Sequence, residues 1–206
     1  MACTNGKTDQ ILGDKVKEHL ITLGLETQVS IPSRGVAHKA LEQGVRSFLY
    51  NMGLDTEDPS IQNTPERVAD MYVNELCYGL DYSNFPKCTT TPNGSVTRTE
   101  EGLTVEGLGA VNEMVMVDSI QTFTLCEHHF QTISGVTHIA YSPSTKLLGL
   151  SKFARITNFF GRRPQVQERM TEQLYAALSF ILETRDVAVQ QVAVHDCMRV
   201  RGAMDP

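Results

Sequence analysis

EMVMVDSIQTFTLCEHHFQTISGVTHIAYS, residues 113–142, decides how this chain folds. Residues 113–125 are rich in strand-forming side chains, and a second strand-like run covers Ile133–Ser142. The link between the two runs, Cys126–Gln131, is polar and contains Cys126-Glu127-His128-His129. The sequence therefore predicts two strands, with a cluster of thiol and imidazole side chains at a strand end.

A second group of metal-ligand side chains, His195-Asp196-Cys197, follows near the end of the chain. Cys126 and His129 are three residues apart, so a tight turn can aim both at one ion, and Cys197 can supply a third ligand. Thiolate and imidazole ligands favour zinc over magnesium or calcium. Three protein ligands leave a fourth position for water, which is the catalytic arrangement. A closed Cys₂His₂ site that only stabilises the fold is the alternative, although the usual paired spacing is absent.

Two histidines then remain beside the metal without being needed as ligands. His128 and His195 are therefore candidates for proton transfer during an attack by activated water.

The last predicted element is a strand from Val187 to Arg201. Its first half is apolar on both faces, which predicts a buried strand. Alternation places His195, Cys197 and Arg201 on one side of its second half.

Helical spacing of apolar residues recurs in five other segments, which are residues 8–24, 35–54, 64–77, 151–160 and 166–183. Ser151 is the predicted N-cap of the fourth helix. Residues 83–112 are polar and predict an exposed loop or a protruding hairpin.

A group of cations surrounds the start of the helix that begins near Ser151. Ser151 and Lys152, with Arg155 one turn further on, suit phosphate binding because free N–H groups, the helix dipole and the cations act together. The polar residues that follow are Arg162, Arg163, Gln167, Glu168 and Arg169. A solvated basic helix face is the alternative interpretation.

Bulk properties exclude several classes of protein. The chain has 206 residues and a net charge of −6, which argues against a duplex nucleic-acid binder. No apolar stretch approaches a membrane span, and the N-terminus lacks a signal-peptide pattern, so we expect a cytoplasmic protein with no membrane partner. The odd count of five cysteines argues against a disulfide framework, and we expect Cys3, Cys77 and Cys88 to be ordinary thiols.

These segments together resemble GTP cyclohydrolase I over most of residues 35–202. The matching motifs are Thr64–Ala69, Gly79–Tyr82, Cys126–Phe130, Gly149–Lys152 with Arg155, Arg163–Arg169, and His195–Cys197 with Arg201-Gly202. Because order, spacing and residue type agree across separate motifs, the resemblance is specific.

The resemblance implies an α+β chain with the tunnelling fold, in which an antiparallel sheet carries helices on one side. It implies an N-terminal helical extension, residues 1–60, and a catalytic domain, residues 61–206. Five subunits would form a barrel-like ring, and two rings would stack into a homodecamer with active sites at subunit boundaries.

The implied reaction converts GTP and water to 7,8-dihydroneopterin triphosphate and formate, the first step of tetrahydrofolate, pterin or deazaguanine synthesis. Carried over by position, Cys126, His129 and Cys197 are the zinc ligands. The resemblance also assigns catalytic roles to His128, His195, Ser151 and Glu127, with His195 protonating guanine N7.

The resemblance likewise assigns the substrate contacts. Glu168 and Gln167 would hold the guanine edge. The other implied substrate-binding residues are Leu150, Ser151, Lys152, Arg155 and Arg201, together with Arg67 from a neighbouring subunit.

Three departures from the family pattern affect these expectations. The sequence stops at Met204-Asp205-Pro206, where members usually continue into a short C-terminal helix, so we expect weaker assembly. Residues 89–112 are longer than in the family, and Asp70 stands where some members carry lysine.

Rival functions follow from the same residues. A homologue that binds GTP without turnover, as a sensor or an inert ring subunit, is the principal alternative. A zinc nucleoside deaminase would need a motif that is missing here. The related nitrile reductases use a nucleophilic cysteine and a nicotinamide cofactor, which the Cys/His/Cys set argues against.

Overall fold

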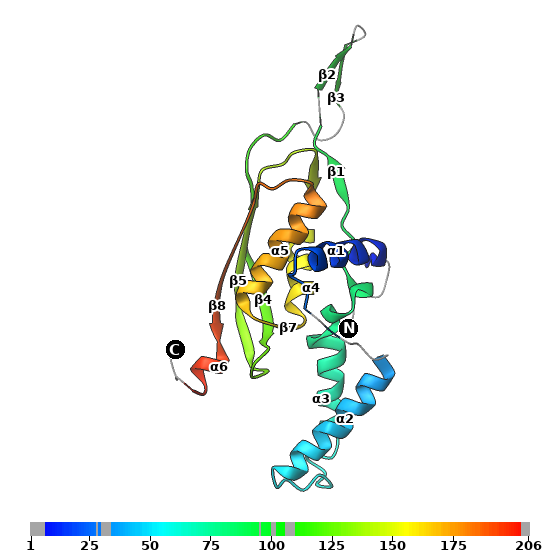
Figure 1. The fold of residues 1–206 in the computed structure, drawn as a ribbon, viewed down its shortest axis with the longest axis vertical. Helices are drawn as coiled ribbons and strands as arrows, with labels where there is room; N and C mark the ends of the chain where they lie inside the picture. Colours follow the sequence, from blue (N-terminus) through cyan, green and yellow to red (C-terminus); the bar gives the residue numbers. More distant parts are fainter. Residues whose placement is uncertain are drawn as a thin grey trace.

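The computed structural model describes residues 7–27, 29, 34–94, 96–99, 102–105 and 110–202 (Figure 1). The described helices are α1 (Gln10–Thr22), α2 (Arg34–Asn51), α3 (Thr64–Asp70), α4 (Leu150–Gly161), α5 (Gln167–Leu182) and α6 (Asp196–Arg199). A π-helical segment, Met71–Leu76, continues α3, and two 3₁₀ turns follow at Tyr78–Leu80 and Tyr82–Asn84. The described strands are β1 (Thr90–Pro92), β2 (Val96–Thr99), β3 (Gly102–Val105), β4 (Val115–Cys126), β5 (Thr132–Tyr141), β6 (Lys146–Leu148), β7 (Pro164–Gln165) and β8 (Val187–His195).

The central sheet has four strands in the order β7-β4-β5-β8. β4 pairs antiparallel with β5, and β5 pairs antiparallel with β8 over its whole length. β7 is short and lies parallel to the end of β4, with Cys126 opposite Gln165. The two strands predicted from residues 113–142 are therefore confirmed as one long antiparallel pair.

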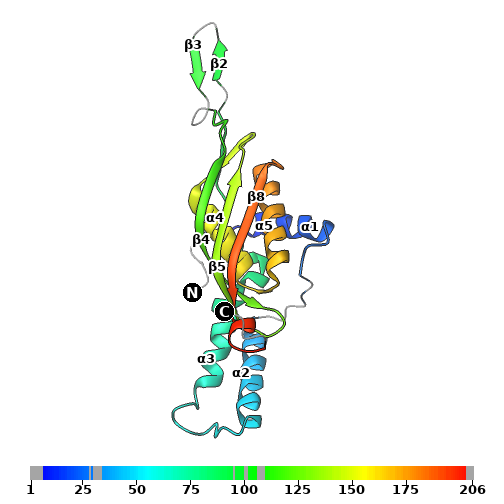
Figure 2. The same ribbon diagram turned by 90° about the vertical axis from the view of Figure 1, so that its left-hand side faces the viewer.

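Helices cover one face of this sheet and leave the other face open. α4 and α5 pack behind the long strands, and α1 lies across α5 (Figure 2). The core between these layers is aromatic and aliphatic, and Phe153, Phe159 and Phe160 of α4 are fully or almost fully buried. Val16 and Leu20 of α1 are fully buried in the same core, so α1 packs as part of the main body.

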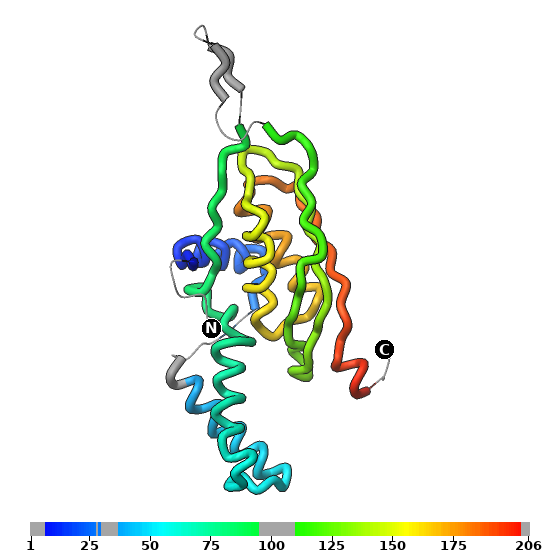
Figure 3. Tube along the Cα trace, turned by 180° about the vertical axis from the view of Figure 1, so that it is seen from behind, coloured from blue at the N-terminus to red at the C-terminus, as the bar shows by residue number. Residues whose placement is uncertain are grey.

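The α2–α3 pair extends away from the sheet, at the end where β8 and α6 finish (Figure 3). The β2–β3 hairpin protrudes at the opposite end (Figure 1). This hairpin confirms that part of residues 83–112 forms a protrusion. Among the residues that the structure describes, no helix combines the length and the apolar character that a bilayer crossing requires.

Two predictions about the last strand are wrong. β8 ends at His195, and residues 196–199 form the helical turn α6, so the strand does not continue to Arg201. β8 is also not buried, because its open face exposes Val192 and Val194. Apolar residues on both faces indicated burial, but in one chain the helices cover only one face and β8 is an edge of the sheet.

The predicted helix boundaries need one correction that concerns the site. Gly149, not Ser151, is the N-cap of α4, and Ser151 lies in the first turn of that helix. The predicted break at Ile31-Pro32-Ser33, Cys3 and the terminal Met204-Asp205-Pro206 lie outside the described residues.

Candidate metal centre and substrate-binding residues

The three predicted metal ligands converge at one end of the sheet. Cys126 is the last residue of β4, His129 lies in the turn that follows, and Cys197 lies in α6. Their ligand atoms all lie within 4.8 Å of one another. Cys126 is buried, His129 is exposed, and Cys197 is half-buried, so the group is open to solvent on one side.

The donor chemistry and the spacing fit a zinc ion. Tetrahedral bonds of about 2.0–2.3 Å place neighbouring ligand atoms roughly 3.5–3.8 Å apart. The Cys126 Sγ lies 4.0 Å from His129 Nδ1, close to that separation. Two thiols and one imidazole could therefore hold a metal and leave a fourth position open.

The turn that carries Cys126 and His129 is closed by backbone hydrogen bonds. The Cys126 N–H donates to the Gln131 carbonyl at 2.8 Å, and the Phe130 N–H donates to the Cys126 carbonyl at 2.8 Å. Phe130 has a φ of 53°, a left-handed conformation that reverses the chain. The tight turn brings residue 129 back beside residue 126.

Cys197 reaches the group because α6 turns the chain after β8. Burial, reinforced by the neighbouring Cys126 thiol, raises the pKa of Cys197. A metal would therefore have to displace a proton from this thiol on binding. Cys77 and Cys88 lie elsewhere, and burial raises their pKa to about 11 and about 12, so both remain protonated thiols at neutral pH.

His195 is held by a side chain from α5. The Gln167 Nε2 donates to the Gln191 carbonyl at 3.1 Å, which leaves Gln167 Oε1 as an acceptor. His195 Nε2 lies 2.7 Å from this oxygen. The hydrogen-bond pattern assigns the proton to Nε2 and leaves Nδ1 free to exchange a proton with a ligand.

Two further side chains of this turn (residues 126–131, the metal turn), those of His128 and Glu127, differ in their partners. His128 is exposed, and its Nδ1 lies 4.0 Å from the Cys126 Sγ. Glu127 forms an ion pair with Arg169 of α5. Sequence reasoning did not single out Arg169 for this role, because nothing in the spacing of residues 127 and 169 indicates that they meet.

The predicted phosphate-binding residues lie far from the metal group within one chain. The Leu148 N–H donates to the Tyr141 hydroxyl at 3.4 Å, and the Phe153 ring lies 5.5 Å from the Tyr141 ring. Tyr141 is the last residue of β5, at the opposite end of the strand from Ile133. The eight residue steps between them span roughly 26 Å. Ser151 and Lys152 therefore start α4 at the opposite end of the sheet from Cys126.

α4 runs from this remote end toward the metal end. Its last residue, Gly161, packs so closely on β4 that a Cβ there would lie 2.6 Å from the Phe123 carbonyl oxygen. Arg155 lies partway along the helix and lines a cavity of about 380 Å³ together with Lys7 and Arg162. Arg155 of α4 and Arg162, which directly follows the helix, thus form a cationic face with a lysine from the N-terminal segment.

Arg163 does not belong to that cationic face, which corrects the grouping made from sequence. Its side chain is fully buried and pairs with Glu26 at 3.1 Å. The guanidinium also packs 5.0 Å from the ring centres of Phe159 and Phe160. Arg163 therefore stabilises the core and is inaccessible to a ligand.

The other predicted substrate-binding residues are exposed. Leu150 opens α4, Glu168 lies in the first turn of α5, Arg201 follows α6, and Arg67 lies on α3. The segment after α3 approaches the metal turn, because the Tyr72 ring lies 6.2 Å from the Phe130 ring. One chain brings together the metal ligands, His128, His195, Gln167 and Glu127, and the charge of Arg201 acts on the Cys197 thiol. Of the predicted triphosphate contacts, Ser151 and Lys152 lie at the other end of the sheet.

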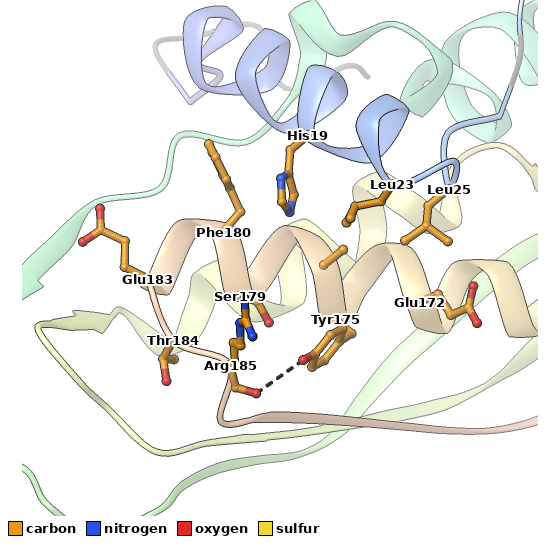
Figure 4. A pocket seen from close by; sticks show the side chains of 11 residues that line it. His19, Leu23, Leu25, Glu172, Tyr175, Ser179, Phe180, Glu183, Thr184 and Arg185 are labelled. Carbon is orange, nitrogen blue, oxygen red and sulfur yellow. Dashed lines mark hydrogen bonds between the residues drawn. The ribbon is translucent and has the colours of Figure 1, made fainter.

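A cavity of about 810 Å³ lies between α1 and α5, away from all of these residues (Figure 4). His19 stacks on Phe180 within it at 4.9 Å between ring centres. None of the predicted site residues lines this cavity.

The fold and the site define a class of protein before any comparison. A mixed α+β chain with an open Cys/His/Cys group and adjacent histidines is typical of a metal-dependent hydrolase. The chain belongs to the GTP cyclohydrolase I family, whose model matches residues 41–206.

Curated relatives agree with this family. A protein from Shewanella amazonensis named GTP cyclohydrolase 1 is 45% identical over 194 residues, covering 93% of this chain and 83% of its own length. Proteins of the same name from Aeromonas salmonicida and Vibrio cholerae are each 44% identical, covering 92% of this chain and 82% of their own length.

Proposed function

We propose that this protein is a GTP cyclohydrolase that converts GTP and water to 7,8-dihydroneopterin triphosphate and formate. Family membership supports the activity and the GTP substrate. The convergence of Cys126, His129 and Cys197 beside two histidines is the structural observation that carries the proposal. A zinc ion bound by these three residues would activate water for attack on the guanine C8 carbon.

His195 is the proposed donor of a proton to guanine N7. In its protonated form, His195 keeps its Nε2–H bond to Gln167 and offers a proton on Nδ1. After transfer, the neutral ring retains the tautomer that the 2.7 Å contact with Gln167 favours. Gln167 would thus orient the catalytic ring, whatever contact it also makes with guanine. His128, exposed beside the metal turn, is the second proposed proton-transfer residue.

The guanine and the triphosphate would be bound by residues of different subunits. Glu168, at the start of α5, is the proposed partner of the guanine N–H groups. Ser151, Lys152 and Arg155, with Leu150 beside them, would form the phosphate end of a neighbouring site, helped by Arg201 and by Arg67 of another subunit. The roughly 26 Å of strand between the two ends of one chain supports a shared site.

A ring assembly would bring these halves together. We propose the tunnelling fold, with five subunits closing a barrel and two barrels forming a decamer. We also propose a helical extension, residues 1–60, whose α1 packs into the core of the catalytic domain that follows. The open apolar face of β8, with Val192 57% and Val194 44% exposed, supports a covering neighbour. A cytoplasmic location is a proposal that rests on the reduced thiols such a metal site requires.

Formate release from GTP, measured at known zinc occupancy, tests the proposed function. Zinc-loaded protein should release formate, and a chelator should abolish the release. Protein that is fully loaded with zinc and binds GTP, yet releases no formate, would instead support the second function, a GTP-binding homologue without turnover.

A further inference from the structure

A network of polar side chains connects the metal turn to the interior of the molecule. Arg169 of α5 pairs with the Glu127 carboxylate and also donates from Nε to Gln165 Oε1 at 3.2 Å. The Gln165 Nε2 donates to Gln173 Oε1 at 2.7 Å, and the Gln173 Nε2 donates to the Leu25 carbonyl at 2.8 Å. The metal turn is thereby tied to α5 and to the segment after α1.

The inner part of this network is rigid because it is buried and its polar groups are all hydrogen-bonded. Gln165 and Gln173 are both fully buried. The Gln165 Nε2 also donates to the Phe160 carbonyl at 3.1 Å, so both ends of its amide are occupied. The Arg169 and Glu127 side chains are 25% and 31% exposed, which makes them the outer link of a buried network.

The network acts on the turn that holds two metal ligands. The Glu127 N–H donates to the Gln165 carbonyl at 3.0 Å, and its carboxylate pairs with Arg169, which itself donates to Gln165, so the backbone and the side chain of Glu127 are fixed to two linked neighbours. Cys126 directly precedes Glu127, and His129 follows two residues later. Any shift of Glu127 therefore moves Cys126 and His129 relative to Cys197.

We propose that Arg169 and Glu127 are positioning residues, which act together to hold the metal turn in its metal-binding conformation. Glu127 then acts through the turn: its Oε2 pairs with Arg169, and its Oε1 lies 4.0 Å from His128 Nε2. This inference rests on the proposed metal site. Partners of this kind around a metal typically change its affinity by about 10- to 100-fold.

Zinc affinity, measured by competition with a chromophoric chelator, tests the proposal directly. Glu127→Gln and Arg169→Met should each weaken zinc binding by about 10- to 100-fold. Arg169→Lys retains the charge but loses the forked geometry, and it provides a milder variant if Arg169→Met does not fold. Glu172→Gln, an exposed site on the same helix, is the matched control and should bind zinc like the wild type.

The double variant Glu127→Gln/Arg169→Met separates a joint role from two independent ones. If the two residues act through each other, the double variant binds zinc no more weakly than the worse single variant. The visible spectrum of the cobalt-substituted protein should change with each single variant, because the thiolate and imidazole geometry changes. Folded variants with wild-type zinc affinity and an unchanged cobalt spectrum would overturn the proposal, and so would additive losses. Wild-type protein that does not bind zinc would instead refute the metal site itself.

Discussion

The two ends of the long β4–β5 pair differ in how much of a functional site one chain supplies. At the Cys126 end, β4, its following turn and α6 place three ligand atoms within 4.8 Å, and His195 is already oriented by Gln167. At the Tyr141 end, α4 presents Ser151 and Lys152 without any of the metal-site residues nearby. One chain brings the three proposed metal ligands together, whereas in the proposed function the phosphate half comes from a neighbour.

The metal end should show the largest effect of a single substitution. Cys197→Ala removes one of three ligands, so we expect loss of bound zinc and a fall in formate release of more than about 1,000-fold. Cys77→Ala, at a half-buried thiol elsewhere in the chain, is the control and should retain both. Metal analysis and the formate assay check the prediction, and a zinc-loaded, active Cys197→Ala protein would contradict it.

The metal end was largely predictable from sequence because its information is local. The Cys126-Glu127-His128-His129 segment is one short turn between two strands with clear patterns. Cys197 was also predicted as a ligand, but its position in a helical turn was not. Strand alternation cannot reveal a four-residue helix after His195. The open face of β8 could not be predicted either, because an apolar strand has the same pattern whether a helix or another subunit covers it.

The residues around α4 were predictable in type but not in position. Lys152, Arg155 and Arg163 look alike in sequence, yet Arg163 is fully buried against aromatic rings and paired with Glu26. Nothing local indicates a partner 137 residues away. The Glu127–Arg169 pair, which joins α5 to the metal turn, likewise forms between residues that are far apart in the sequence. The tertiary fold, and not the motif, decides which cations are available to a ligand.

The buried pair between Glu26 and Arg163 should separate stability from substrate binding. Glu26→Ala leaves the fully buried guanidinium without its carboxylate, which should lower the free energy of unfolding by about 3–5 kcal/mol. The KM for GTP should not change in the protein that remains folded. Denaturant unfolding and steady-state kinetics measure the two quantities. A raised KM at unchanged stability would indicate that Arg163 contributes to substrate binding and not to the core.

The α4 end should show a smaller effect that is confined to substrate binding. Lys152→Met removes one proposed phosphate contact, worth about 1.5–3 kcal/mol, and should raise the KM for GTP by about 10- to 100-fold. Zinc content should stay at the wild-type level because Lys152 lies at the other end of the sheet. Lys146→Met, on β6 and paired with Glu183, is the matched control and should leave the KM unchanged. Loss of zinc from the Lys152→Met protein would contradict the claim that the two ends of the sheet act independently.

Subunit mixing tests the shared site most directly. Cys197→Ala and Lys152→Met/Arg155→Met chains, co-expressed with different tags and purified through both, each retain the half that the other lacks. At GTP concentrations well below the KM of the Lys152→Met/Arg155→Met protein, we predict little activity from either parent and about a quarter of wild-type activity from the mixed assembly, because random mixing pairs two intact halves at about one interface in four. A mixed assembly no more active than its parents, or a monomeric wild-type fraction with full activity, would contradict the shared site.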